Sequence, residues 1–198
     1  LIANAFLAQR ISSINTVSAL CEVTGADVRE VALAIGSDTR IGSSFLNSGP
    51  GFGGSCFKKD ILNLVYLCRH FGLSEVASYW EQTIIINNWQ QNRIANQVIQ
   101  NLFGTVTGKK IAILGFAFKA NTNDTRETPS IRIAKSLLEE GAKLAIHDPK
   151  VDPKQIGIDL NKEPIILGQN ENEEGNWQHS LDIIEAVRGS DAVIILTE

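Results

Sequence analysis

Two short apolar runs separated by a helical segment place the strongest constraint on the fold of this chain. The runs are "IAILG" at 111–115 and "LAI" within "KLAIH" at 143–147, and each is expected to form a strand. Between them, residues 129–140 repeat apolar side chains at helical spacing. A strand, a crossover helix and a second strand together predict a parallel sheet.

The same alternation continues to residue 196. A helix is expected at 180–187 and a strand at 192–196, which makes the second half of the chain an α/β domain. The stretch from 148 to 179 is predicted to be irregular. Its acidic, Asn-rich part between Pro153 and Trp177 indicates a mobile surface excursion.

The first hundred residues show helical periodicity instead. Helices are expected over 1–24, 26–36, 60–72 and 74–103. Gly25 and Gly36 are plausible helix stops, and Val28, Val31 and Leu33 are expected to face inward. The aperiodic stretch 39–54 holds five glycines and is predicted to be a loop.

The fourth helix would be roughly 45 Å long at 1.5 Å per residue. That length exceeds one small domain, so we expect it either to bridge two domains or to build a subunit interface. We place the domain boundary at its end, giving a helical domain at 1–104 and an α/β domain at 105–198. The sequence opens on an apolar helix and closes on a strand, so we expect a segment of a longer protein.

Composition excludes several classes of function. A net charge of −4 gives no basis for nucleic-acid binding, and no apolar run is long enough to span a membrane. With no secretory leader in sight, a cytoplasmic location is expected. The three cysteines share no C-x-x-C spacing, which argues against disulfides and a zinc site. No metal is expected, and the three histidines, His70, His147 and His179, receive no catalytic role.

The segment "GPGFGGSCFKKD" at 49–60 carries the strongest chemical signal. Glycines let the backbone approach a ligand, and Ser55 is a fair N-cap for the helix that follows. Cys56 then falls in the first turn, where the helix dipole and two following lysines favour a thiolate. Asp60 lies four residues on, so it shares a helix face with Cys56 and could accept a proton. The alternative is a small cysteine packed at a helix start, whereas Cys21 and Cys68 fit inert core positions.

Three motifs in order resemble the UDP-glucose/GDP-mannose dehydrogenase family: "ANAFLAQRISSIN", "GFGGSCFKKDILNLVYL" and "ILGFAFKANTNDTRETPS". The resemblance covers nearly the whole chain. It implies an all-helical central dimerisation domain with a long connecting helix, followed by a truncated Rossmann-like UDP-binding domain. The family's N-terminal NAD-binding domain would lie outside this sequence.

The resemblance also implies a reaction. In this family UDP-glucose is oxidised to UDP-glucuronate by NAD in two steps, through a cysteine thiohemiacetal and a thioester. Cys56 matches the nucleophile, Asp60 the residue that assists the attacking water, and Asn4 an asparagine that positions water or the developing oxyanion. The family's catalytic lysine and glutamate would precede Leu1, so the segment alone is expected to be incomplete.

Binding residues follow from the same resemblance. Cys56, Lys59 and Arg126 match residues that contact NAD. Besides Asn4, the residues that match contacts to the nucleotide sugar are Arg40, Phe45, Leu46, Asn47, Phe52, Gly53, Phe118 and Lys119. Arg40 would reach across a subunit interface, so a homodimer or a higher homo-oligomer is expected. The chain departs from the family pattern at Asn47, where relatives often have lysine, and at Gly49-Pro50.

Several alternatives stay open at the level of sequence. Arg40 could be a solvated surface charge, and Phe118 and Lys119 could be a core aromatic and a surface lysine. The strand ending at Gly115 is not followed by G-x-G-x-x-G, so it is a poor fingerprint for a dinucleotide. The segment could be an inactive dimerising nucleotide-binding scaffold. The substrate could also be a UDP-N-acetylhexosamine or GDP-mannose.

Overall fold

The structure is a computed structural model that describes residues 1–165 and 175–197. Its contacts divide the chain into two compact units, Leu1–Gln90 and Gln91–Glu198. The division falls inside the long helix α4 (Ser74–Asn101), which therefore contributes residues to both units. None of the described helices is both long and apolar enough to cross a lipid bilayer.

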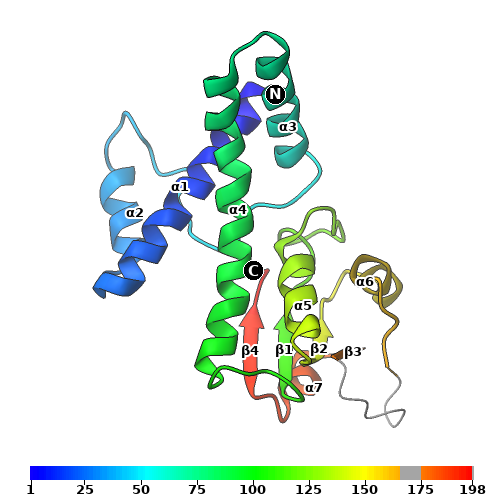
Figure 1. The fold of residues 1–198 in the computed structure, drawn as a ribbon. Coiled ribbons are helices and arrows are strands. Elements are labelled where there is room, and N and C mark those ends of the chain that lie inside the picture. Colours follow the sequence, from blue (N-terminus) through cyan, green and yellow to red (C-terminus); the bar gives the residue numbers. More distant parts are fainter. Residues whose placement is uncertain (166–174, 198) are drawn as a thin grey trace. The chain divides into compact units, whose positions relative to one another are not determined.

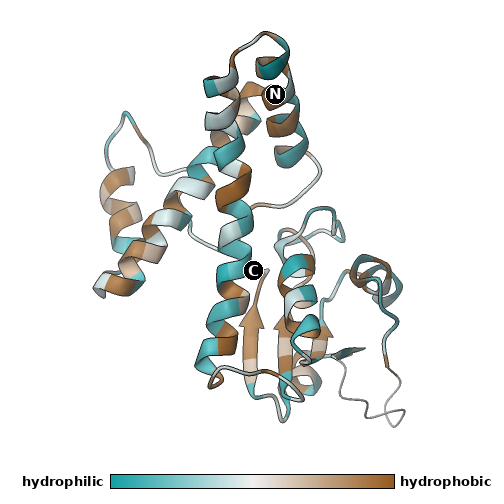
Figure 2. Ribbon diagram, viewed as in Figure 1, coloured by the Kyte–Doolittle hydropathy of each residue, from teal (hydrophilic) through white to brown (hydrophobic). Residues whose placement is uncertain are grey.

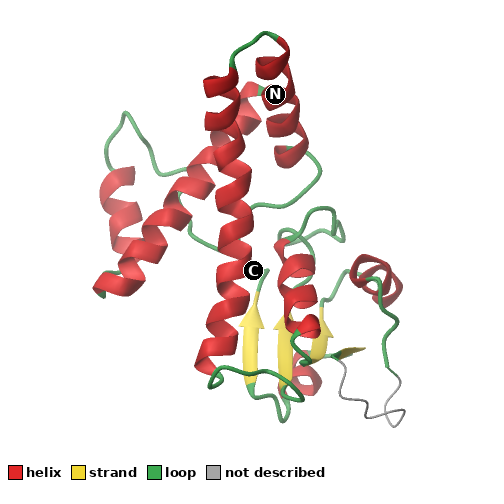
Figure 3. Cartoon of the chain, viewed as in Figure 1, coloured by secondary structure: helices red, strands yellow, loops and turns green. Residues whose placement is uncertain are grey.

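The first unit is helical in its described residues (Figure 1). It contains α1 (Ile2–Thr24), α2 (Val28–Gly36), α3 (Phe57–His70) and the first part of α4. Gly25 ends α1 in the left-handed conformation, with φ 76°, as its position in the sequence predicts. The chain between α2 and α3 contains no regular element (Figure 3), which confirms the predicted loop.

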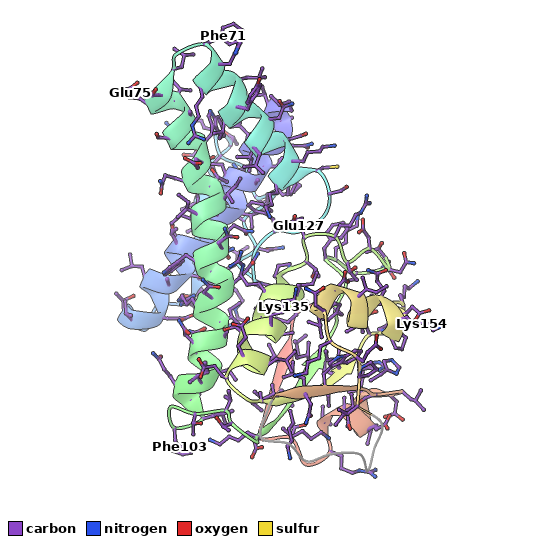
Figure 4. All side chains as sticks on the ribbon, turned by 45° about the vertical axis from the view of Figure 1, so that its right-hand side comes forward. Phe71, Glu75, Phe103, Glu127, Lys135 and Lys154 are labelled. Carbon is purple, nitrogen blue, oxygen red and sulfur yellow. The ribbon has the colours of Figure 1, made fainter. Side chains whose placement is uncertain are left out.

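Packing in this unit joins α1, α3 and α4. Its core consists of Ala5, Ala8, Phe52, Ile61, Leu64, Val65, Cys68, Ala77 and Ile84. The tight turn between α3 and α4 contains Phe71, labelled in Figure 4. The expectation that Leu33 faces inward is wrong, because its side chain is 73% exposed. The short helix α2 packs against α1, and one neighbouring helix covers too little of its surface to bury Leu33.

The second unit holds a four-stranded, all-parallel sheet in the order β3-β2-β1-β4, which confirms the predicted parallel sheet. Its strands are β1 (Lys110–Leu114), β2 (Lys143–His147), β3 (Asn176–His179) and β4 (Ala192–Ile195). Its remaining helices are α5 (Pro129–Glu139), α6 (Pro153–Leu160) and α7 (Ile183–Val187).

The prediction of an irregular segment from 148 to 179 is wrong at both ends. Asp152 caps α6 by accepting a hydrogen bond from the Lys154 N–H, and Pro153 occupies the first turn of the helix. Strand β3 pairs with β2. The sequence analysis missed it because its sequence, NWQH, lacks the apolar run that marks β1. The predicted helix at 180–187 begins later, after the Asp182 cap. Residues 166–174 of the predicted mobile excursion lie outside the described residues.

The two faces of this sheet carry side chains of different size. Ile111, Ile113, Leu144 and Ile146 lie in the core cluster that includes residues of α5 and α6. Ala112 and Ala145 face the other way and pack with Ala186 of α7, and these small side chains let that helix come close to the sheet. Figure 2 shows β1, β2 and β4 as largely apolar, β3 as hydrophilic and the helices as mixed. Strand β1 lies between β2 and β4, and the chain continues from β1 to β2 on one side and later returns to β4 on the other. The carboxyl end of β1 is therefore a topological switch point, where α/β sheets bind ligands.

Candidate functional site

Cys56 lies at the start of α3, at the end of the long loop that follows α2. It occupies the N-cap position, one residue later than the N-cap predicted from the sequence, which was Ser55. The difference arises because the first helical residue is Phe57, and the Cys56 carbonyl already accepts the Asp60 N–H at 2.9 Å. The Cys56 side chain is exposed, and its Sγ lies 3.7 Å from the Ser55 hydroxyl. Cys21 and Cys68 are free and buried.

Asp60 is held by a residue of a different helix. The side-chain amide of Asn4, on α1, donates a hydrogen bond of 2.7 Å to Asp60 Oδ2. The Asn4 hydrogen bond, opposed by burial and helped by the charge of Lys59, holds the pKa of Asp60 below its usual value. Asp60 is therefore an oriented carboxylate at neutral pH, one helical turn from Cys56.

The loop between α2 and α3 is fixed by polar side chains that the sequence analysis did not identify. Asn87 binds both backbone groups of Phe52, accepting from its N–H at 2.8 Å and donating to its carbonyl at 3.1 Å. Both backbone groups of Gly49 are bound as well. Its N–H donates to the side-chain oxygen of Asn15, and its carbonyl accepts from the side-chain amide of Gln90, each at 2.9 Å. All three amide side chains are buried beside other polar residues of α1 and α4, so they need hydrogen-bond partners, but no apolar pattern in the sequence marked them as buried.

Arg10 of α1 anchors the earlier part of the same loop. Its guanidinium donates hydrogen bonds to the carbonyls of Ile41, Gly42 and Ser44, at distances of 2.7–3.0 Å. Arg40, immediately before this stretch, forms a two-pronged ion pair with Asp38, and its side chain is 87% exposed.

An open hollow of about 360 Å³ lies beside this loop, lined by Ile11, Phe45, Asn47, Gly49 and Gly51. Two of the residues expected to contact the nucleotide sugar, Phe45 and Asn47, therefore line one cavity. Leu46 and Phe52 are each only 6% exposed, so their side chains pack in the protein interior. Gly53 is also buried.

A second cavity, of about 570 Å³, opens at the carboxyl ends of β1 and β2 in the other unit. Its lining includes Gly115, Lys119, His147, Asp148 and Thr197. The Lys119 ammonium lies 5.4 Å from the centre of the Phe118 ring. These two residues of the predicted nucleotide site are therefore neighbours at the switch point of the sheet, where a small ligand is expected.

Asp148 is a site residue that the sequence analysis missed. It follows β2 directly and is 7% exposed. Its Oδ2 accepts the N–H groups of Phe116 and Ala117 at 2.7 and 3.0 Å, and its Oδ1 accepts those of Lys150 and Val151 at 2.8 and 3.0 Å. Burial raises the pKa of Asp148, but the four backbone donors outweigh it and hold the pKa below its usual value.

The same contacts bear on whether this unit could hold a dinucleotide. In Rossmann-type sites the turn after the first strand offers its N–H groups to the pyrophosphate. Here the N–H groups of Phe116 and Ala117 are bound to Asp148, and the glycine fingerprint is absent from that turn. The turn after β1 therefore does not fit a dinucleotide pyrophosphate.

Arg126 lies in the loop before α5, next to Glu127, which is labelled in Figure 4. Its guanidinium makes a two-pronged ion pair with Asp124, at 2.9 and 2.7 Å. Hydrogen bonds from the Arg126 side chain and from its backbone N–H lower the pKa of Asp124 to about 2. Arg126 is thus oriented by its own loop, with its side chain 69% exposed.

Comparison with known proteins matches both units. Residues 1–89 match the central domain of the UDP-glucose/GDP-mannose dehydrogenase family, and residues 112–198 match the UDP binding domain of the same family. The UDP-glucose 6-dehydrogenase of Drosophila melanogaster is 56% identical over 198 residues, covering all of this chain and 41% of the relative. That of Gallus gallus is 58% identical over 199 residues, covering all of this chain and 40% of the relative.

A solved structure agrees with these matches. A UDP-glucose dehydrogenase from the hyperthermophilic archaeon Pyrobaculum islandicum is similar with a TM-score of 0.83 and 32% identity, over 99% of this chain and 41% of that one. The chain thus spans about two fifths of the length of the curated relatives it matches.

Proposed function

We propose, because this chain belongs to the UDP-glucose/GDP-mannose dehydrogenase family, that the protein containing it oxidises UDP-glucose to UDP-glucuronate with NAD. The observation that carries this proposal is the arrangement at the start of α3. An exposed thiol lies one helical turn from a carboxylate, and the carboxylate is held by an amide from α1. The curated relatives of 55–58% identity are UDP-glucose 6-dehydrogenases, which favours UDP-glucose over other nucleotide sugars.

The thiol accounts for the retention of the intermediate. Oxidation of the sugar alcohol gives an aldehyde, and the Cys56 sulfur adds to its carbonyl carbon to form a thiohemiacetal. Loss of a second hydride converts this adduct into a thioester. Water then attacks the thioester carbon, the C–S bond breaks, and the sulfur leaves with the bonding pair as the carboxylate forms. An exposed sulfur at a helix start can reach such a substrate, whereas Cys21 and Cys68 are buried.

Asp60 and Asn4 serve the hydrolytic step. Asp60 is ionised at neutral pH, so it accepts a proton from the attacking water. Asn4 donates to Asp60 Oδ2 and so fixes the orientation of the carboxylate. Asn4 also stands beside the reacting carbon, where its amide positions the water or the developing oxyanion.

The proposed cofactor contacts in this chain are Cys56, Lys59 and Arg126. NAD, when bound, accepts the hydride in each of the two oxidations. The cationic side chains of Lys59 and Arg126 suit an anionic dinucleotide, and both are exposed. Because the turn after β1 does not fit a pyrophosphate, the principal dinucleotide site is assigned to a part of the protein outside this sequence.

The nucleotide sugar is proposed to contact residues of each unit. In the first unit, Phe45 and Asn47 contribute side chains from the loop hollow, while Leu46 and Gly53 are buried and offer backbone groups. Phe52 is the weakest of these candidates, because Asn87 already binds both of its backbone groups. In the second unit, Lys119 pairs with a phosphate and Phe118 packs against the nucleotide.

Three further points remain part of the proposal. Arg40 acts across a subunit interface, so the helical domain dimerises and the active form is at least a homodimer. The second unit is a truncated Rossmann-like domain. The expected cytoplasmic location stays a prediction.

The experiment that tests this function measures NADH formation by the full-length protein with UDP-glucose, UDP-N-acetylglucosamine and GDP-mannose side by side. We expect two NADH per UDP-glucose, and we expect Cys56→Ser to abolish turnover while UDP-glucose still binds. Preference for another sugar would reassign the substrate. Nucleotide binding with no NADH formation from any of the three sugars would favour a dimerising scaffold without activity.

A further inference from the structure

We infer that Arg10 is a positioning residue of the nucleotide-sugar loop, fixing the segment 41–46 through three of its backbone carbonyls. This inference rests on the proposed function for its kinetic consequences. Its structural content can be tested without that function.

Arg10 binds the backbone of the loop with all three nitrogens of its guanidinium. Its Nε donates to the Ser44 carbonyl at 2.9 Å, its Nη1 to the Ile41 carbonyl at 3.0 Å, and its Nη2 to the Gly42 carbonyl at 2.7 Å. The guanidinium is planar and carries five N–H donors in a fixed fork. All three nitrogens therefore bind one short stretch of backbone. The planar guanidinium fixes the direction in which each N–H points.

The segment that Arg10 binds has little other regular structure to hold it. It contains no helix or strand, and the N–H groups of Ile41 and Gly42 turn back onto the Asp38 carbonyl. Phe45, directly after Ser44, has φ 61°, a conformation that a bulky side chain adopts only when its surroundings hold it. The Arg10 contacts supply such a constraint on the residue immediately before Phe45.

The consequence for the site lies in the residues next to the three bound carbonyls. Arg40 precedes Ile41, and Phe45 follows Ser44 and lines the hollow together with Asn47. Arg10 is not among the residues that line that hollow, so it acts on a ligand through the loop. Because α1 also carries Asn4, one helix positions both the Asp60 carboxylate and the first half of the loop.

The second half of the loop has separate anchors, which makes the effect of Arg10 local. Gly49 is bound by Asn15 and Gln90, and Phe52 by Asn87. Loss of Arg10 should therefore release 41–46 while leaving 49–53 and the start of α3 in place.

The test compares Arg10→Ala and Arg10→Lys in the full-length protein by hydrogen–deuterium exchange and by steady-state kinetics. Arg29→Ala is the matched control, since Arg29 is an exposed arginine paired with Asp27 on α2. In both Arg10 variants we expect amide exchange to rise roughly tenfold or more over 41–46 and to stay unchanged over 49–53. Lysine keeps the charge but not the fork, so it should not rescue the loop.

The kinetic readout separates positioning from catalysis. We expect KM for UDP-glucose to rise on the order of 10- to 100-fold, with a smaller change in kcat and an unchanged alkylation rate at Cys56. Unchanged exchange over 41–46 overturns the inference, as does exchange that rises throughout Leu1–Gln90 in both variants or full rescue by lysine. If the unmutated protein does not oxidise UDP-glucose, the proposed function fails, and the exchange data still decide the role of Arg10.

Discussion

The side-chain amide of Asn4 donates a 2.7 Å hydrogen bond to the carboxylate of Asp60, joining α1 to the first turn of α3 across 56 residues of sequence. The contact occupies Oδ2 and fixes the plane of the carboxylate. Since Cys56 lies one turn before Asp60 on the same helix, the orientation of this carboxylate relative to the thiol is set by α1. Asn4 thus has a structural effect on the site in addition to its proposed contact with the substrate.

Replacing Asn4 with alanine should raise the pKa of Asp60 toward its ordinary value, because the first of the interactions that lower it is removed. A carboxylate with a lowered folded pKa stabilises the fold above its unfolded pKa, and that contribution is lost as pH falls through the folded value. The free energy of unfolding of the variant should therefore fall less steeply with decreasing pH than that of the unmutated protein. Carboxyl-carbon NMR titration of Asp60 measures it, with Asn101→Ala, an exposed asparagine at the end of α4, as control. An unchanged titration of Asp60 in the Asn4 variant would contradict the assignment.

Alkylation should distinguish Cys56 from the other two cysteines. Cys56 is exposed, whereas Cys21 and Cys68 are 5% and 8% exposed, so the buried thiols react only when the structure opens locally. An opening free energy of about 3 kcal/mol would slow them on the order of 100-fold. Peptide mapping after timed treatment with iodoacetamide measures the three rates. In the full-length protein, UDP-glucose should protect Cys56, and equal rates at all three positions would count against its role as nucleophile.

The sequence predicts best those elements whose packing produces an apolar pattern. Strands β1 and β2 are buried on both faces, and their Ile, Leu and Ala runs were sufficient to place them and to predict a parallel sheet. Strand β3 was missed because its residues are mostly polar and its place in the sheet depends on pairing with β2. Helix α6 was missed although Asp152 and Pro153 carry the usual start signal.

The candidate site divides in the same way. Cys56 and Asp60 were placed from their spacing, because a separation of four residues on a helix fixes a shared face. Arg10 and Asp148 could not be found in this manner, since both bind backbone groups of distant segments. Any residue presents such backbone groups, so no side-chain pattern in the sequence marks the partner.

Asp148→Asn should destabilise the second unit. The carboxylate accepts four backbone N–H groups, whereas an amide offers one oxygen and turns its NH₂ toward donors that it cannot satisfy. Leaving buried donors unpaired costs about 1–3 kcal/mol for each group, so we expect a loss of about 2–4 kcal/mol in the free energy of unfolding. Asp152→Asn is the control, because asparagine is also a good N-cap. Urea denaturation compares them, and equal losses would contradict a special role for Asp148.

The same residue predicts a pH dependence. Burial works against the charged form of Asp148, yet the backbone donors hold its folded pKa below the unfolded value of about 3.9. Its contribution to stability is therefore complete well above pH 4 and is lost as pH falls through the folded pKa. Urea midpoints measured from pH 6 downward should fall less steeply in Asp148→Asn than in the unmutated chain. Parallel curves would show that this carboxylate is not linked to acid unfolding.

Gly115→Ala should distort the cavity at the end of β1. Gly115 has φ 86°, a conformation that costs a side-chain-bearing residue about 1–2 kcal/mol. An added Cβ would also lie 2.5 Å from Thr197 Cβ and 2.8 Å from its backbone nitrogen. Thr197 lines the cavity and donates to the Ala117 carbonyl at 2.6 Å, so a shift of Thr197 would disturb the turn that carries Lys119.

Gly189→Ala separates the two effects, because Gly189 has a similar φ of 67° and its added Cβ would meet no atom within 4 Å. We expect Gly189→Ala to lose only the conformational cost, and Gly115→Ala to lose about 1–3 kcal/mol more, as overpacking against a backbone atom does. UDP binding by calorimetry should weaken in Gly115→Ala and stay unchanged in Gly189→Ala. Equal unfolding free energies for the two variants would mean that the close approach of Thr197 to Gly115 does not constrain the cavity. If the two variants lose equal stability and Gly189→Ala also binds UDP more weakly, the nucleotide binds elsewhere in the domain.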